Sequence, residues 1–138
     1  MSDAPAIAHL HGKSFARGWS AQEVEGLLLD RHVIAHRALV GGHIVGFILS
    51  RLVDAEAEIL SVAVAQQQRG RGVARHILDT HLRRLAGLGA SVVFLEVDEQ
   101  NQPALRLYQK AGFEQVSRRP NYYSRSAAGA LVLRRDLN

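Results

Sequence analysis

The sequence has 138 residues, a length typical of one domain, and its 47% hydrophobic and 22% charged residues are those of a folded chain rather than a disordered one. It contains no cysteine, which excludes a disulfide framework, a thiolate zinc site and a cysteine nucleophile. The formal net charge is +4, but acidic residues are scattered throughout and aromatic residues amount to 6%, so charge alone does not indicate a nucleic-acid-binding protein. No apolar run approaches the roughly 20 residues of a membrane-spanning helix, and residues 1–5 lack the pattern of a signal peptide. We therefore expect a cytoplasmic protein with no membrane partner.

The chain begins with a pattern typical of two helices. Apolar residues at helical spacing predict a first helix over residues 4–15. Ser20 and Glu23 have the spacing of a capping box, which predicts a second helix that begins after Ser20 and ends near Asp30.

Three strands should follow as an antiparallel meander. Residues 33–40 and 44–52 have the pattern of strands, and the intervening Gly41-Gly42 is a two-residue hairpin signal. A third strand is predicted over residues 58–65.

The second half of the chain has the sequence pattern of a strand–helix–strand unit. The polar, glycine-containing segment 66–72 leads into a long amphipathic helix over residues 73–88. Residues 91–97 form an almost continuous apolar run, which predicts a strand buried on both faces and parallel to the strand before the helix.

A short helix and two strands complete the pattern. Pro103 suits the beginning of a helix over residues 104–111, and residues 113–118 and 130–136 are the last two strands. We expect one domain over residues 1–138, of mixed α/β (α+β) class. Its sheet should have an antiparallel first half, a parallel pair at the glycine loop, and helices on both faces.

The segment Gln67-Gln68-Arg69-Gly70-Arg71-Gly72 is the most informative part of the sequence. A glycine loop between a strand and a helix presents unpaired N–H groups and the positive end of the helix dipole, which suits a pyrophosphate. By itself such a loop is more often a simple turn, and it lacks both the third glycine of the dinucleotide fingerprint and the Gly-Lys-Ser/Thr of a P-loop. Arg69 and Arg71 are either phosphate donors or solvated charges.

Two segments together give a family resemblance. The glycine loop resembles the acetyl-CoA pyrophosphate signature of the GNAT acetyltransferases. The segment Asn101-x-x-Ala104-x-x-Leu107-Tyr108-x-x-x-Gly112-Phe113 resembles the second coenzyme-binding segment of that family at matching spacing. Leu95-Glu96-Val97, Arg118-Arg119-x-Asn121-Tyr122-Tyr123 and Phe15…Trp19-Ser20 look like the ribosomal-protein-alanine N-acetyltransferases within the family. The resemblance covers almost the whole chain from about Ala4.

The resemblance implies a GNAT-like fold and acetyl-CoA as the cosubstrate, without a metal. In such sheets two strands splay apart and leave backbone groups free for the pantetheine arm. Asn101 either bonds that arm or forms a turn. The residues expected to bind the coenzyme are Val62, Val64, Gln67, Gln68, Arg69, Gly70, Arg71, Gly72, Val73, Ala74, Asn101 and Tyr108.

The implied chemistry is attack of an amine on a thioester. Glu96 matches the general base of the family and would act through water, whereas Tyr108 matches the acid that protonates the coenzyme A thiolate. Each has a plainer alternative. Glu96 at the end of a strand could cap backbone or pair with an arginine, and Tyr108 could fill the core beside Leu105 and Phe113.

The expected acceptor is the N-terminal amine of a peptide, most closely the alanine of a ribosomal protein. Trp19, Arg119, Tyr122 and Tyr123 are the expected substrate-binding residues, although two such tyrosines also suit half-buried packing. Three alternatives stay open: an acetyltransferase for a small-molecule amine or a lysine side chain, a non-catalytic acyl-CoA-binding module, and a basic RNA-binding domain. We expect a monomer or weak dimer that does not bind nucleic acid directly.

Three features depart from the family or carry no signal. The chain begins almost in its first helix, so either the first edge strand is missing or the coding start was placed late. Asp98-Glu99 follows the proposed base where relatives often carry a basic residue, and this indicates either a preference for a cationic amine or a different substrate. The histidines show no metal-site spacing, and His36 is expected to have a surface role.

Overall fold

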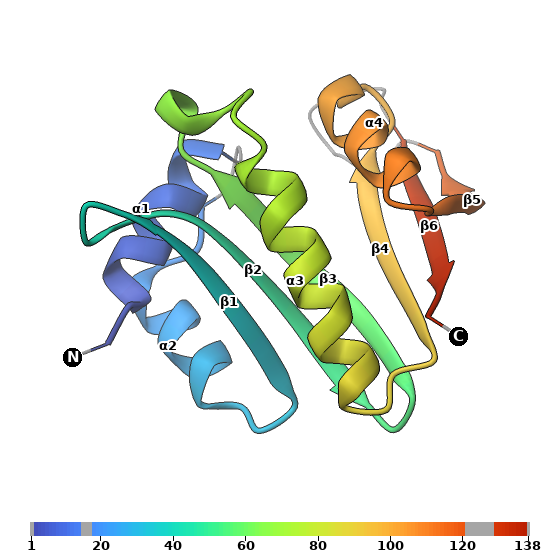
Figure 1. The fold of residues 1–138 in the computed structure, drawn as a ribbon, viewed down its shortest axis with the longest axis horizontal. Coiled ribbons are helices and arrows are strands. Elements are labelled where there is room, and N and C mark those ends of the chain that lie inside the picture. The colour runs from blue at the N-terminus through green and yellow to red at the C-terminus, as the bar shows by residue number, and fades with distance from the viewer. Residues whose placement is uncertain (1, 15–17, 121–128, 138) are drawn as a thin grey trace.

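A six-stranded mixed sheet forms the centre of the molecule (Figure 1). The structure is a computed structural model that describes residues 2–14, 18–120 and 129–137. The strands follow the spatial order β1-β2-β3-β4-β6-β5. They are β1 (Val33–Val40), β2 (His43–Val53), β3 (Glu56–Val64), β4 (Val92–Asp98), β5 (Glu114–Arg119) and β6 (Ala130–Asp136). The helices are α1 (Ala4–Ser14), α2 (Ala21–Leu29), α3 (Val73–Gly87) and α4 (Gln102–Lys110), with a 3-10 turn η1 (Gln66–Gln68).

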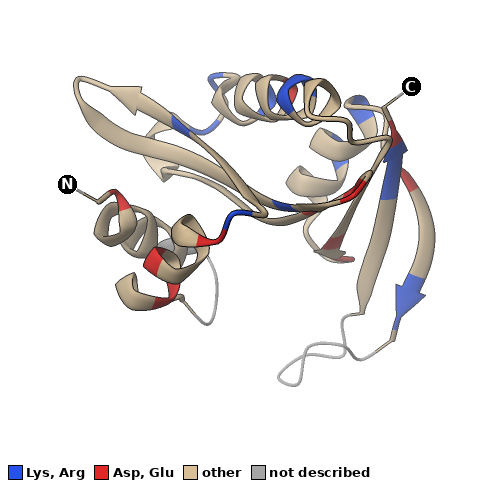
Figure 2. Cartoon of the chain, turned by 90° about the horizontal axis from the view of Figure 1, so that it is seen from below, with Lys and Arg blue, Asp and Glu red and all other residues tan. Residues whose placement is uncertain are grey.

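The topology confirms the predicted fold class. Strands β1, β2 and β3 form an antiparallel meander, β3 pairs with β4 in parallel, and β4, β6 and β5 are antiparallel neighbours. Helices α1 and α2 pack on one face of the sheet, and α3 and α4 pack on the other (Figure 2). The predicted third strand is shifted, since β3 begins at Glu56 rather than at residue 58.

The predicted capping box at α2 is present. The Ser20 hydroxyl accepts a hydrogen bond from the Glu23 amide at 3.0 Å, and the Ser20 amide donates to the Glu23 carboxylate at 3.2 Å. This reciprocal arrangement satisfies two amide groups that a helix start otherwise leaves unpaired. The helix ends at Leu29 with Asp30 as its C-cap, close to the predicted end.

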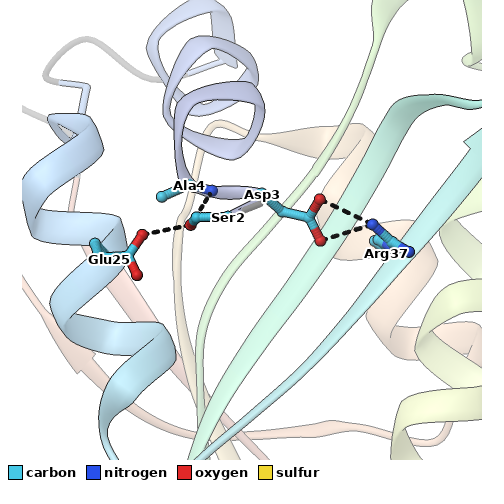
Figure 3. Close-up of polar contacts among 5 residues, drawn as sticks. All are labelled: Ser2, Asp3, Ala4, Glu25 and Arg37. Atoms are coloured by element: carbon cyan, nitrogen blue, oxygen red, sulfur yellow. Dashed lines mark hydrogen bonds and ion pairs between the residues drawn. The ribbon is translucent and has the colours of Figure 1, made fainter.

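The beginning of α1 is tied to both α2 and β1 (Figure 3). Arg37 of β1 donates from Nη1 to both carboxylate oxygens of Asp3, at 2.8 and 2.7 Å. The Ser2 hydroxyl donates to Glu25 of α2 and accepts from the Ala4 amide. Exposed pairs of this kind are each worth about 1 kcal/mol or less, so they orient α1 more than they stabilise the fold.

A buried polar chain links β1, β2 and α3. His81 of α3 is fully buried, and its Nε2 lies 2.6 Å from the Ser50 hydroxyl while its Nδ1 lies 2.7 Å from Nδ1 of His36. The expected surface role of His36 is therefore wrong. Ile34, His36 and Ala38 alternate onto the face of β1 that packs under α3, so the imidazole is half-buried there. Burial, and secondarily the neighbouring His36, lowers the pKa of His81 to about 3.

The buried His81 makes stability depend on pH. In the unfolded chain a histidine takes up a proton near pH 6.5, whereas folded His81 stays neutral down to about pH 3. Between these values the unfolded state binds more protons, so the free energy of unfolding falls as the pH is lowered. The contribution of His81 between pH 7 and pH 5 is about 2 kcal/mol. Urea unfolding at both pH values measures it.

The control for this prediction is His81→Gln. The variant has no titrating group at this position, so its loss of stability between pH 7 and pH 5 should be smaller than that of the parent by about 2 kcal/mol. An identical pH dependence in the two proteins would show that His81 does not exclude its proton.

Candidate active site

Strands β3 and β4 diverge halfway along their length (Figure 1). Their parallel ladder ends at the pair Ile59 and Leu95. Beyond it β3 continues to Val64 paired with β2, and β4 continues to Asp98 paired with β6. Main-chain groups along the inner edges of the opening are thus available to a ligand. Ser61, in this part of β3, has a buried hydroxyl that finds no hydrogen-bond partner in the described part of the chain.

The chain leaves β3 through a tight turn before the glycine loop. The Gln68 amide donates to the Ala65 carbonyl at 2.9 Å, and the Arg69 amide donates to the Gln66 carbonyl at 3.2 Å. These two N–H groups are already used within the turn, so they do not belong to the unpaired set that a phosphate needs. The run of unpaired backbone amides that could bind an anion, here called the anion cradle, therefore begins at Gly70.

Gly70 and Gly72 give the cradle its shape. Both have φ of +78°, a left-handed conformation that costs a residue with a side chain about 1 kcal/mol or more. A Cβ atom would meet nothing within 4 Å at either position, so the glycines serve the backbone conformation and leave open space before it. Gly72 is the N-cap of α3 and has no side chain that could cap the helix. The first backbone amides of α3, including those of Val73 and Ala74, therefore lack an intrahelical hydrogen-bond partner. This geometry fits a diphosphate.

Three other predicted coenzyme contacts have identifiable local roles. The Arg69 Nε donates to the Val64 carbonyl at 3.1 Å, which braces the loop against the end of β3. Arg71 is exposed beside the two glycines. The Asn101 side chain accepts from the Ala104 amide at 3.2 Å and caps α4, which is the turn-forming alternative expected from the sequence. Contacts of these residues with the coenzyme stay predictions.

The two faces of β4 differ, which corrects the prediction of a strand buried on both. Val93, Leu95 and Val97 face the core beneath α3 and α4, whereas Phe94 and Glu96 are half-exposed on the opposite face. The apolar cluster under α1 and α2 draws on β2 and β3, so these helices leave β4 uncovered on that side (Figure 2).

An open groove of about 810 Å³ occupies the uncovered face. Glu96 and Arg119 both line it, so the structure brings together the proposed base and one predicted acceptor contact. Its wall also includes Arg51, Glu56, Glu58 and Phe94. A smaller hollow of about 500 Å³ contains Trp19 and shares Arg51 with the groove. Tyr122 and Tyr123 lie outside the described residues.

Trp19 is held in place by a histidine that sequence reasoning missed. The His11 and Trp19 rings are stacked, with centroids 4.1 Å apart and planes 8° apart. The Trp19 amide donates to Nδ1 of His11 at 3.0 Å, which requires that nitrogen to be unprotonated. Burial, opposed by Glu23, lowers the pKa of His11 and so favours this state.

Glu96 forms the ion pair that its plainer interpretation anticipated. Nη1 of Arg119 lies 3.0 Å from Oε1 of Glu96, whose side chain is 27% exposed. The neighbouring Glu99 accepts from Arg118 at 2.6 and 2.8 Å and from the Gly129 amide at 2.8 Å. These hydrogen bonds, that of Arg118 first, lower the pKa of Glu99 to about 2. The carboxylate of Glu99 is thus engaged by Arg118, which weakens the expectation that it attracts a cationic amine.

Tyr108 lies on the other side of β4 from Glu96. It packs in the core with Leu105, and its ring meets that of Phe113 edge-on with centroids 5.7 Å apart. This is the packing alternative expected from the sequence. Burial raises the pKa of Tyr108 to about 12, so its hydroxyl stays protonated at neutral pH and can donate a hydrogen bond. The base candidate and the donor candidate therefore lie on opposite faces of β4.

A sheet opened between parallel strands, with a glycine loop at the start of the following helix, defines a class of acyltransferases. Residues 4–113 match the model of the "Acetyltransferase (GNAT) family", and the chain belongs to that family. It is an acetyltransferase, and its acetyl donor is acetyl-CoA. Within the described ranges, no helix is long and apolar enough to cross a membrane.

Several proteins similar to this chain have named activities. The chain is 33% identical to the N-alpha-acetyltransferase RimI of Mycobacterium tuberculosis over 98% of this chain and 87% of that protein. It is 27% identical to the [ribosomal protein bS18]-alanine N-acetyltransferase of Escherichia coli over 88% of this chain and 82% of the other. The crystal structure of the Escherichia coli ribosomal-protein-S18-alanine N-acetyltransferase shares the fold, with a TM-score of 0.91 at 24% identity over 99% of this chain and 88% of that one. A 43% identical segment of an uncharacterized Mycobacterium leprae protein covers 59% of this chain but 22% of that protein.

Proposed function

We propose that the protein transfers an acetyl group from acetyl-CoA to the N-terminal α-amine of a protein, in particular the alanine of a ribosomal protein. The observation that carries this proposal is the open groove of about 810 Å³ that Glu96 lines, which leaves the proposed base accessible from solvent. The relatives named above support it, because their names describe N-terminal and ribosomal-protein-alanine acetylation.

The residues around the opening fit the coenzyme. The amides from Gly70 to Ala74 would hold the pyrophosphate, and the inner edge of β3 at Val62 and Val64 would lie along the pantetheine arm. When bound, acetyl-CoA supplies the activated acetyl thioester. The chain's own residues then orient the two reactants and move the protons.

Glu96 would accept the proton of the attacking amine through a water molecule. Its position on the groove face of β4 lets a peptide amine approach without displacing the core. An α-amine has a pKa of about 7.7–8.0, so a substantial fraction is already neutral near pH 7, whereas a lysine amine near 10.4 is almost wholly protonated. One glutamate acting through water is therefore better matched to the α-amine.

A panel of acceptors tests the proposed function. With acetyl-CoA, the kcat/KM for peptides that begin with alanine should be at least about tenfold above that for a peptide with a blocked N-terminus and an internal lysine. The reason is that a larger fraction of the α-amine is already deprotonated near neutral pH. Peptides beginning with serine and methionine, and a free polyamine, complete the panel, and mass spectrometry locates the acetyl group. A higher kcat/KM for the blocked peptide or the polyamine would refute the N-terminal assignment but leave the acetyltransferase intact.

A further inference from the structure

Arg119 reaches across a whole strand to contact the proposed base. It is the last residue of β5 and pairs with Ala130 of β6, whereas Glu96 of β4 pairs with Val132 on the other side of β6. Backbones separated by one intervening strand are roughly 10 Å apart. Both side chains must therefore extend toward each other to bring Nη1 and Oε1 to 3.0 Å, and the contact holds the Glu96 carboxylate against the guanidinium.

The backbone beneath Arg119 is anchored to the same end of β4. Arg118 pairs with Glu99, and the Glu99 amide donates to the Gly129 carbonyl at 3.0 Å while the Gly129 amide donates to the Glu99 carboxylate. A Cβ atom on Gly129 would lie 2.8 Å from the Arg119 carbonyl, so the two chain segments approach as closely as glycine permits. The Arg119 side chain thus extends from a firmly held backbone position.

We propose that Arg119 is a positioning residue that holds the Glu96 carboxylate in the orientation required for proton transfer. This role differs from the direct acceptor contact expected from the sequence, and it rests on the proposed base. It also makes the end of β5 part of the catalytic apparatus, because the guanidinium contacts the group that reacts.

The exposure of the Arg119–Glu96 pair indicates that its loss should affect the reaction rate more than the stability of the fold. The Arg119 side chain is 57% exposed and that of Glu96 is 27% exposed. Ion pairs in such surroundings contribute about 1 kcal/mol or less to stability, so the fold should survive their removal. Proton transfer is far more sensitive, because a shift of about 1 Å in a reacting group can cost a hundredfold in rate. Removal of the ion pair should therefore lower kcat.

A double-mutant cycle with Glu96 tests the proposal. Arg119→Ala should lower kcat by about tenfold, or about 1.4 kcal/mol, while the KM values for peptide and acetyl-CoA change by less than about twofold. Arg119→Lys should recover about a third or more of the lost rate, since it keeps the cation. When Glu96→Gln is already present, Arg119→Ala should cost less than about twofold, because no base is left to position.

Arg37→Ala is the matched control. It removes the exposed ion pair between Arg37 of β1 and Asp3, which lies outside the groove and apart from Glu96, so any loss that it causes should multiply with that of Glu96→Gln. A higher peptide KM with unchanged kcat in Arg119→Ala, or a loss that multiplies with Glu96→Gln, would overturn the positioning role.

Failure of the proposed function gives a different result. If α-amine peptides are not acetylated but another amine is, the N-terminal assignment fails and the same cycle is measured on that amine. Wild-type turnover in Glu96→Gln would refute the base and the positioning role together.

Discussion

Replacing Glu96 with glutamine should lower kcat by about a hundredfold or more at neutral pH, the usual loss when a general base is removed. Glutamine keeps the size of the side chain and its capacity to accept a hydrogen bond from Arg119, but it cannot take up a proton. Glu96 lies at the edge of the β3–β4 opening on the groove face, so the change touches no core packing. Single-turnover acetylation of an alanine-first peptide, followed by mass spectrometry, measures the rate.

The control is Glu114→Gln, which removes an exposed carboxylate at the start of β5, away from the groove. Its turnover should stay within about twofold of the parent, as is usual for surface substitutions away from a site. Acetyl-CoA affinity should be unchanged in both variants. Near-parental kcat in Glu96→Gln would mean that Glu96 serves its ion pair with Arg119 and not the reaction.

Replacing Tyr108 with phenylalanine should also lower kcat by about a hundredfold while acetyl-CoA still binds. The ring and its edge-on contact with Phe113 are retained, and the hydroxyl alone is lost. With a pKa of about 12, the phenol stays protonated throughout an ordinary assay range. The same high pKa makes full proton transfer to a thiolate unfavourable, so we expect Tyr108 to act mainly as a hydrogen-bond donor to the leaving sulfur.

Changing the leaving group of the acetyl donor distinguishes a catalytic role of Tyr108 from a packing role. An acetyl thioester of a more acidic thiol needs less help to depart, so Tyr108→Phe should reduce its turnover by about tenfold or less. An equal defect with both thioesters would assign Tyr108 to the core alone. Calorimetric titration with acetyl-CoA and a thermal unfolding midpoint within about 2 °C of the parent confirm that fold and binding are intact.

The elements that local chemistry specifies were predictable from the sequence. The capping box at Ser20 placed α2 within a residue, and glycines with positive φ ended β1 and opened α3 as expected. The strand pattern placed His36 in β1, but it did not reveal that His36 meets His81 on a distant helix. Such contacts depend on the twist and stacking of layers, which no local pattern encodes.

The candidate site was predictable in a different way. Glu96 and Tyr108 were assigned by family resemblance. The glycine loop was identified from its position between a strand and a helix, and the resemblance then indicated its ligand. Pairing of Glu96 with an arginine was an expected alternative, but the sequence did not identify Arg119 as the partner, because the contact crosses β6. The support of Trp19 by His11 was not predicted, because it depends on how α1 and α2 meet. The apolar run of β4 suggested two buried faces, since sequence hydrophobicity does not register where covering helices end.

The placement of Glu96 and Tyr108 on opposite faces of β4 has a consequence for traffic through the enzyme. On the proposed roles, a peptide would reach the opening between β3 and β4 from the groove, and acetyl-CoA would reach it from the side of α3 and α4. The two reactants would then be bound at the same time, and the acetyl group would pass directly from one to the other without a covalent intermediate on the protein. Each product would also have its own way out, so the acetylated peptide would be free to leave while coenzyme A is still bound.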